Sequence, residues 1–108
     1  MEQWAEKKCK PCEGGTRPFT EDEAKKALLQ IPGWTLEGNT IVKVFSFKNF
    51  YETMAFANTV AFIANREDHH PDMKLAYKTC EVRYSTHAIQ GLSENDFICA
   101  AKIEQILK

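Results

Sequence analysis

Glu67-Asp68-His69-His70-Pro71-Asp72 is the stretch around which this sequence is organised. Its two adjacent histidines precede a proline, which disfavours helical geometry in the residue before it. The pair is therefore expected on a loop between two elements, where functional side chains often lie. The remaining histidine, His87, follows in Ser85-Thr86-His87-Ala88. Because imidazoles exchange protons near neutral pH, we expect the fold to bring both segments together around a small polar substrate.

The composition indicates one globular domain, residues 1–108. Of the 108 residues, 44% are apolar and 27% charged, and the formal net charge is -1. A chain of this size buries enough surface for one core. The mixed charges give no reason to expect a nucleic acid or an anionic membrane as a partner. Without a signal peptide or a membrane-spanning run, we expect a cytoplasmic protein with reduced cysteines.

Two cysteines near the N-terminus, in Cys9-Lys10-Pro11-Cys12, have the spacing of half a zinc site or of a redox pair. The other half of a zinc site is missing, because Cys80 and Cys99 lie far apart and lack a partner at ligand spacing. A redox motif would normally follow a strand and open a helix, but this one precedes the glycines of a loop. We therefore interpret residues 1–19 as an irregular leader without essential thiol chemistry.

The rest of the chain alternates between helical and strand patterns. Helices are predicted where a capping residue precedes an apolar stripe of helical period: 21–30, 50–66 and 94–107. Strands are predicted where β-branched and aromatic residues run between turn residues: 34–36, 40–47, 73–77 and 81–86. The turn between the last two strands is expected at Lys78-Thr79-Cys80.

This α-β-β-α-β-β-α order predicts an α+β fold, a four-stranded antiparallel sheet with three helices packed on one face. In the strand 40–47, Ile41 and Phe45 share one face, whereas Val42 and Val44 lie on the other. Both faces are thus partly apolar, so we expect another copy of the chain to cover the second face. The protein is predicted to be a homo-oligomer, a dimer or a tetramer.

The residues by themselves leave three interpretations of the histidines open. General acid–base catalysis needs no cofactor, and Asp68 and Asp96 could fix the tautomers of the rings. Metal binding is the second, although directly adjacent histidines rarely both reach one ion. The third is structural, with a loop histidine bonded to the backbone and Asp96 serving only in the capping box that begins at Ser93.

Several motifs together resemble the signature of the pterin-4a-carbinolamine dehydratases. They are Asp68-His69-His70-Pro71, the aromatic Tyr77, Ser85-Thr86-His87, and Gly91-Leu92-Ser93-Glu94 followed by Asp96. The spacing from the histidine pair to the third histidine, and onward to Asp96, is similar to that of the family. The leader Cys12-Glu13-Gly14-Gly15 resembles bacterial-type members. The similarity spans nearly the whole chain, and the family has the same order of elements.

The resemblance implies an enzyme, a hydro-lyase acting on 4a-hydroxytetrahydrobiopterin. This carbinolamine is released when aromatic amino acid hydroxylases, phenylalanine hydroxylase among them, use tetrahydrobiopterin. Loss of water gives quinonoid dihydrobiopterin, which a reductase recycles. The reaction needs a proton for the departing hydroxyl and removal of a proton from N5, with neither a metal nor an organic cofactor.

The resemblance also implies roles for individual residues. His70 and His87 would be the proton-transfer pair, and His69 would orient the substrate near its 4a-hydroxyl. Asp96 would support His87 electrostatically and would be counted among the substrate-binding residues. The substrate pocket would further be lined by neighbours of the histidines: Asp68, Ser85, Thr86 and Ala88.

Two positions depart from the family pattern. Asn65 stands where many members carry an acid, so no binding role for a carboxylate is carried over to that position. Met73 stands where an aromatic residue is common, which changes how the pterin ring is flanked. The alternative function is that of a dimerisation scaffold or transcriptional coactivator without essential catalysis, a second role of animal members of the family.

Overall fold

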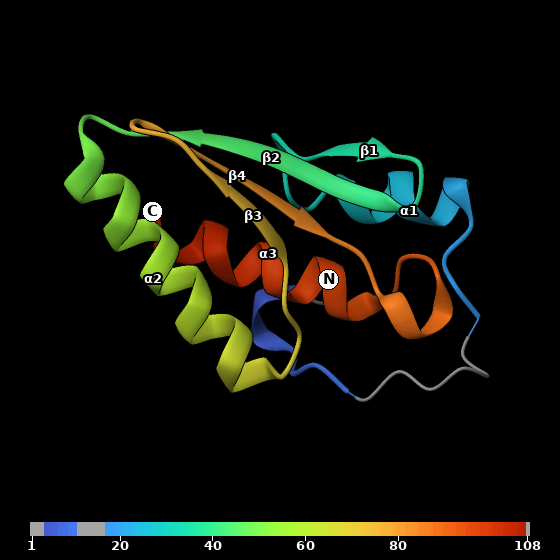
Figure 1. The fold of residues 1–108 in the computed structure, drawn as a ribbon. Coiled ribbons are helices and arrows are strands. Elements are labelled where there is room, and N and C mark those ends of the chain that lie inside the picture. The colour runs from blue at the N-terminus through green and yellow to red at the C-terminus, as the bar shows by residue number, and fades with distance from the viewer. Residues whose placement is uncertain (1–3, 11–16, 108) are drawn as a thin grey trace.

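The computed structural model describes residues 4–10 and 17–107, in which three helices lie on one face of a sheet (Figure 1). The helices are α1 (Glu21–Leu28), α2 (Phe50–Glu67) and α3 (Glu94–Ile106). The strands are β1 (Thr35–Glu37), β2 (Thr40–Ser46), β3 (Asp72–Leu75) and β4 (Thr79–Tyr84). Two 3-10 turns are also present, η1 (Trp4–Glu6) and η2 (His87–Ile89). The predicted fold class and element order are confirmed.

The sheet has the strand order β1-β2-β4-β3, and every neighbouring pair is antiparallel. The long pairing of β2 with β4 forms its centre, with Ile41 opposite Tyr84 and Phe45 opposite Cys80. This ladder extends β4 backwards, so the β3–β4 turn lies before Thr79 and not at 78–80 as predicted. It also ends at Tyr84, so His87 belongs to η2 and not to the end of a strand.

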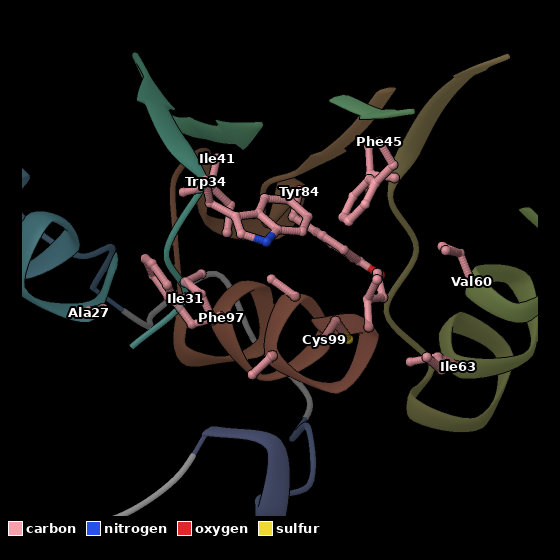
Figure 2. Packing of buried hydrophobic residues seen from close by; sticks show 14 of the residues in the cluster. Ala27, Ile31, Trp34, Ile41, Phe45, Val60, Ile63, Tyr84, Phe97 and Cys99 are labelled. Atoms are coloured by element: carbon pink, nitrogen blue, oxygen red, sulfur yellow. The ribbon is translucent and has the colours of Figure 1, made fainter. Parts of the chain in front are cut away.

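The core lies between the inner face of the sheet and the three helices. Figure 2 shows Trp34, Phe45 and Tyr84 on the sheet side of this core, over α3 with Phe97 and Cys99. Side chains alternate between the two faces along a strand, and Val82 of β4 lies on this inner face, where it is completely buried. The largest fully buried side chains of this core are less than 2% exposed: Tyr84, Phe97, Ile31, Ile41, Ile63 and Ile103.

The outer face of the sheet carries both apolar and charged side chains, and its cover by another copy of the chain stays a prediction. Val42 is buried within its own chain, beside its ladder partner Arg83. The Arg83 guanidinium is paired with Glu37 at 2.9 Å and with Glu81 at 3.4 Å. Val44 remains 54% exposed opposite Glu81. Charged side chains, and not a second apolar layer, therefore flank the valines of this face.

Part of the leader packs on α3. The Trp4 ring stacks on Phe97 with 5.9 Å between ring centroids, and the ammonium of Lys102 donates to the Ala5 carbonyl at 2.8 Å. Residues 4–10 therefore form an ordered segment with its own 3-10 turn, whereas the leader was predicted to be irregular. Cys12 and the following glycines lie outside the described residues.

We expect a valine-to-threonine substitution to destabilise the protein more on the inner face of the sheet than on the outer face. Val82→Thr places a hydroxyl among buried side chains and should lower the free energy of unfolding by roughly 1–3 kcal/mol. Val44→Thr keeps the β-branched shape at an exposed position and should change it by less than about 0.5 kcal/mol. Urea unfolding followed by circular dichroism measures both. Equal losses would show that the outer face is covered in solution.

Candidate active site

The end of α2 positions the two adjacent histidines. Asp68 ends the helix in the left-handed conformation, with φ 53° and ψ 42°, a region that aspartate tolerates better than most residues. The backbone N–H groups of Asp68 and His69 both donate to the carbonyl of Ala64. The chain thus turns sharply before Pro71. Both histidines lie on this turn, directly after the end of α2.

A closed loop at the end of β4 positions His87. The backbones of Thr86 and Gly91 form a bridge, with the Thr86 N–H donating at 2.8 Å and the Gly91 N–H at 3.3 Å. Gly91 has room for no side chain, because a Cβ atom would lie 2.6 Å from Cβ of Pro18. The bridge closes a short loop that contains η2. His87 is the first residue of η2, and its side chain is exposed.

These two segments line one cavity of about 460 Å³. This volume is within the range of pockets that hold small molecules. Seven of the eight residues predicted to bind the substrate line the cavity, from the α2 turn and the η2 loop: Asp68, His69, His70, Ser85, Thr86, His87 and Ala88. A separate groove of about 300 Å³ between α2 and α3 is mostly apolar and has Glu52 as its one ionisable lining residue.

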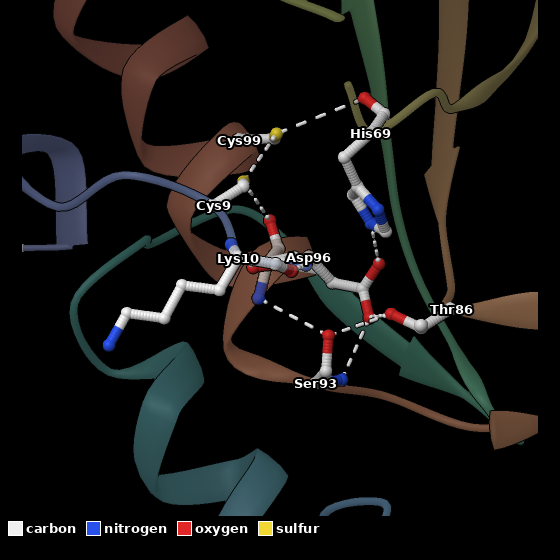
Figure 3. A network of polar contacts seen from close by, with 8 residues as sticks. Cys9, Lys10, His69, Thr86, Ser93, Asp96 and Cys99 are labelled. Atoms are coloured by element: carbon white, nitrogen blue, oxygen red, sulfur yellow. Dashed lines mark hydrogen bonds and ion pairs between the residues drawn. The ribbon is translucent and has the colours of Figure 1, made fainter. Parts of the chain in front are cut away.

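Asp96 does not line this cavity. Figure 3 shows it at the centre of a network with His69, Thr86 and Ser93. Its carboxylate is completely buried and accepts three hydrogen bonds. The donors are the Ser93 backbone N–H at 2.9 Å, the Thr86 hydroxyl at 2.8 Å and the His69 ring at 2.6 Å. Ser93 and Asp96 also form the capping box of α3. Asp96 therefore caps α3 and also contacts one histidine of the cluster.

The partner of Asp96 corrects one prediction. Asp96 was expected to support His87, but its Oδ1 atom contacts Nε2 of His69. The capping box directs the other oxygen, Oδ2, toward the Ser93 N–H. Oδ1 then faces the turn at the end of α2, whereas His87 projects from the exposed side of its loop.

His69 is held on a second side by Tyr84. The two rings are nearly parallel, 8° apart in orientation, with centroids separated by 5.7 Å. Burial raises the pKa of the Tyr84 phenol above its ordinary value, so the ring facing His69 is uncharged. The His69 side chain is only 11% exposed. Its orientation is consequently fixed by a hydrogen bond and by stacking.

The other two histidines are exposed at the mouth of the cavity. Nε2 of His70 lies 3.3 Å from Oδ1 of Asn65, the residue at which the family pattern often has an acid. An amide at that place offers the ring a neutral hydrogen-bond acceptor. The cluster therefore combines one fixed imidazole with two that can exchange protons with water.

Four further residues line the cavity that sequence analysis did not assign: Cys9, Lys10, Glu67 and Asn95. Cys9 and Asn95 come from opposite ends of the chain, and no periodicity or spacing connects them. The one local signal is a single cysteine among lysines at 7–10. A hydrogen bond shared with the Cys99 thiol, together with burial, raises the pKa of Cys9 above its ordinary value. Its thiol is therefore protonated at neutral pH.

Within residues 4–10 and 17–107, no group of three or more histidine, cysteine or acidic side chains is arranged to hold a metal ion. None of the helices in this part of the chain combines the length and apolar character needed to cross a membrane.

Comparison with solved structures supports the fold. A transcriptional coactivator/pterin dehydratase from Brucella melitensis superposes with a TM-score of 0.80 and 33% identity, over 85% of this chain and all of that one. A pterin dehydratase-like protein identified as a RuBisCO assembly factor in the alpha-carboxysome has a TM-score of 0.57 at 18% identity, over 68% and 84%. The second likeness concerns the fold alone.

Comparison of sequences identifies the family. The chain is 58% identical over 104 residues to a protein of Nitrosomonas eutropha, covering 95% of this chain and 92% of that one. It is 55% identical over 108 residues to one of Nitrosospira multiformis, covering 100% and 96%. Both are named "Putative pterin-4-alpha-carbinolamine dehydratase". The model of the family described as pterin 4 alpha carbinolamine dehydratase matches residues 17–106. The chain therefore belongs to the pterin 4 alpha carbinolamine dehydratase family.

Proposed function

We propose that this protein dehydrates 4a-hydroxytetrahydrobiopterin to quinonoid dihydrobiopterin. The observation that carries the proposal is the convergence of His69, His70 and His87 on one cavity of about 460 Å³. A flat bicyclic ring fits a hollow of this size. Imidazoles on different segments can address different atoms of the same ring, which is the arrangement that a dehydration requires.

The chemistry needs two proton transfers at adjacent atoms. One imidazole accepts the N5 proton while an imidazolium donates a proton to the hydroxyl on C4a. The C4a–O bond breaks with its electron pair on oxygen, water leaves, and the C4a–N5 double bond forms. We assign these transfers to His70 and His87, because both are exposed and can return to their starting protonation states through solvent.

His69 has a different role in this proposal. Its Nε2 atom is engaged by the Asp96 carboxylate, and its ring is stacked on Tyr84. This leaves Nδ1 as the ring nitrogen that can face the substrate. A ring that cannot swing is suited to orienting the 4a-hydroxyl, since a fixed contact holds the leaving group in line with its proton donor.

In the cell, this activity would return the oxidised pterin to the recycling of tetrahydrobiopterin used by phenylalanine hydroxylase. We place the enzyme in the cytoplasm. We also propose that it is a homo-oligomer that associates through β3. This strand is an open edge of the sheet, and it carries Met73 and Leu75 at 38% and 44% exposure.

The alternative function, a dimerisation scaffold or transcriptional coactivator, is supported by the name of the Brucella melitensis protein and by exposed aromatics on α2. Tyr51 is 88% exposed and Phe62 is 62% exposed. A coactivator would keep its partner binding after His87→Ala, whereas a dehydratase would lose turnover.

Loss of either exposed histidine should reduce turnover far more than stability. His70→Ala and His87→Ala each remove one proton carrier and should lower kcat roughly 10²–10⁴-fold. Because both side chains are exposed, the free energy of unfolding should change by less than about 0.5 kcal/mol. The substrate is generated with a phenylalanine hydroxylase, and the quinonoid product is followed by absorbance. Lys26→Ala on α1 is the control. No acceleration by the wild-type protein over the spontaneous reaction would end the proposal.

Neutralising the buried carboxylate should weaken the positioning of His69. Asp96→Asn replaces a charge-assisted hydrogen bond with a neutral one, and kcat/KM should fall roughly ten- to a hundredfold. Ser93→Ala is a matched control in the same buried network, because its side chain does not contact His69. It should cost stability of about 1 kcal/mol from the lost cap but little turnover. Equal kinetic losses would show that only the stability of the network matters.

The proposed oligomer is tested at the β3 edge. Size-exclusion chromatography with light scattering should give a mass above that of the 12.4 kDa chain at micromolar concentration. Leu75→Lys adds a charge at this edge and should shift the protein toward monomer. Leu29→Lys, at a position that is 80% exposed after α1, should leave the mass unchanged. A monomeric wild-type protein would exclude the association.

A further inference from the structure

The family match begins at residue 17, yet the cavity is also lined by Cys9 and Lys10. We propose that residues 4–10, the N-terminal strap, form a wall of the pterin pocket and determine how tightly the substrate is held. Asn95 is the residue that positions this wall. The inference rests on the proposed function, since it concerns binding of the same pterin.

The strap is attached along α3 at several points. Trp4 stacks on Phe97, and the Ala5 carbonyl accepts from Lys102. Nearer the cavity, the Lys7 ammonium pairs with Glu94 at 3.1 Å. The segment therefore follows α3 toward its N-terminal end, where the Asp96 carboxylate lies (Figure 3).

At the cavity, the strap joins the two helix ends that carry the site. The side-chain amide of Asn95 accepts from the Lys10 N–H at 3.0 Å and donates to the Lys10 carbonyl at 2.5 Å. The Cys9 N–H donates to the Glu67 carboxylate at 3.0 Å. Asn95 directly precedes Asp96, and Glu67 directly precedes Asp68. The position of the wall is thus fixed relative to the histidine cluster by hydrogen bonds on both sides.

The chemical character of the wall suits binding and not proton transfer. The Sγ atom of Cys9 lies 3.5 Å from Sγ of Cys99, and the thiol is protonated at neutral pH. A neutral, polarisable thiol can pack against the face or edge of a flat heterocycle. It does not compete with the imidazoles as a base. Changes in the wall should therefore alter KM and leave kcat nearly unchanged, as expected when binding is lost equally in the ground state and the transition state.

Protection of the Cys9 thiol tests the location of the wall directly. Cys12→Ser removes the cysteine outside the described residues, and Cys80 and Cys99 are buried. Modification by N-ethylmaleimide is followed by mass spectrometry, with and without 7,8-dihydrobiopterin, a pterin that has no 4a-hydroxyl. With the pterin at about ten times its Kd, modification of Cys9 should slow about tenfold.

The result separates this inference from the proposed function. Calorimetry measures binding of the same pterin to the same protein. If the pterin binds and Cys9 reacts at an unchanged rate, the wall is disproved and the pterin site stands. If the pterin does not bind, both proposals fail.

Kinetics of point variants test the role of Asn95. Asn95→Leu keeps the volume but removes both hydrogen bonds to Lys10, and KM for the carbinolamine should rise about five- to tenfold with kcat within about twofold. Lys26→Ala, at an exposed position of α1 outside the strap and the cavity, is the control and should change neither parameter. A fall in kcat with KM unchanged would show that Asn95 acts through Asp96 instead, and would overturn the assignment.

A second variant guards against misfolding of Asn95→Leu, because Asn95 is itself buried. Cys9→Leu enlarges the wall from the half-buried strap and should also raise KM several-fold while kcat holds. Thermal unfolding establishes that this variant is folded. An unchanged KM in folded Cys9→Leu protein would contradict the proposal independently of Asn95.

Discussion

A buried carboxylate governs the architecture of this site. An ionised group removed from water is stable only when hydrogen bonds replace its hydration. Asp96 meets this requirement with donors from three segments: the end of α2, the start of the η2 loop and the cap of α3. The same three bonds hold those segments against one another. These bonds place His69, and Thr86 at the start of the loop that carries His87, at the same cavity.

The three imidazoles are consequently not equivalent. His69 is enclosed between a carboxylate and an aromatic ring, and it has little freedom to reorient. His70 and His87 are exposed and lie on two turns, each of which contains one residue in the left-handed conformation, Asp68 in the first and Gln90 in the second. The proposed dehydration would use both kinds of side chain, a fixed ring to orient the substrate and exposed rings to exchange protons with water.

The leader gives the family domain an additional layer. The core and the histidine cluster belong to residues 17–106, which the family model matches. Residues 4–10 add a ring stacked on Phe97 and a stretch of backbone bonded to the Asn95 amide. The interpretation of Cys9 as lacking essential thiol chemistry is compatible with its protonated thiol. Its place in the structure is at the edge of the cavity and not in a separate loop.

The types of the elements and their order could be predicted from the sequence, because capping boxes, apolar periods and turn residues are local signals. The sequence also identified the histidine segments, whose neighbours lie beside them in the chain. Tertiary structure decided what depends on segments distant in sequence. Because β2 pairs with β4 as far as Thr79, the turn between β3 and β4 lies before Thr79. Because α2 packs against α3, the Asp96 carboxylate contacts His69, 27 positions away in the sequence, and not His87. The hydrogen bond between Lys10 of the strap and Asn95 joins residues 85 positions apart, so no local sequence signal could predict it.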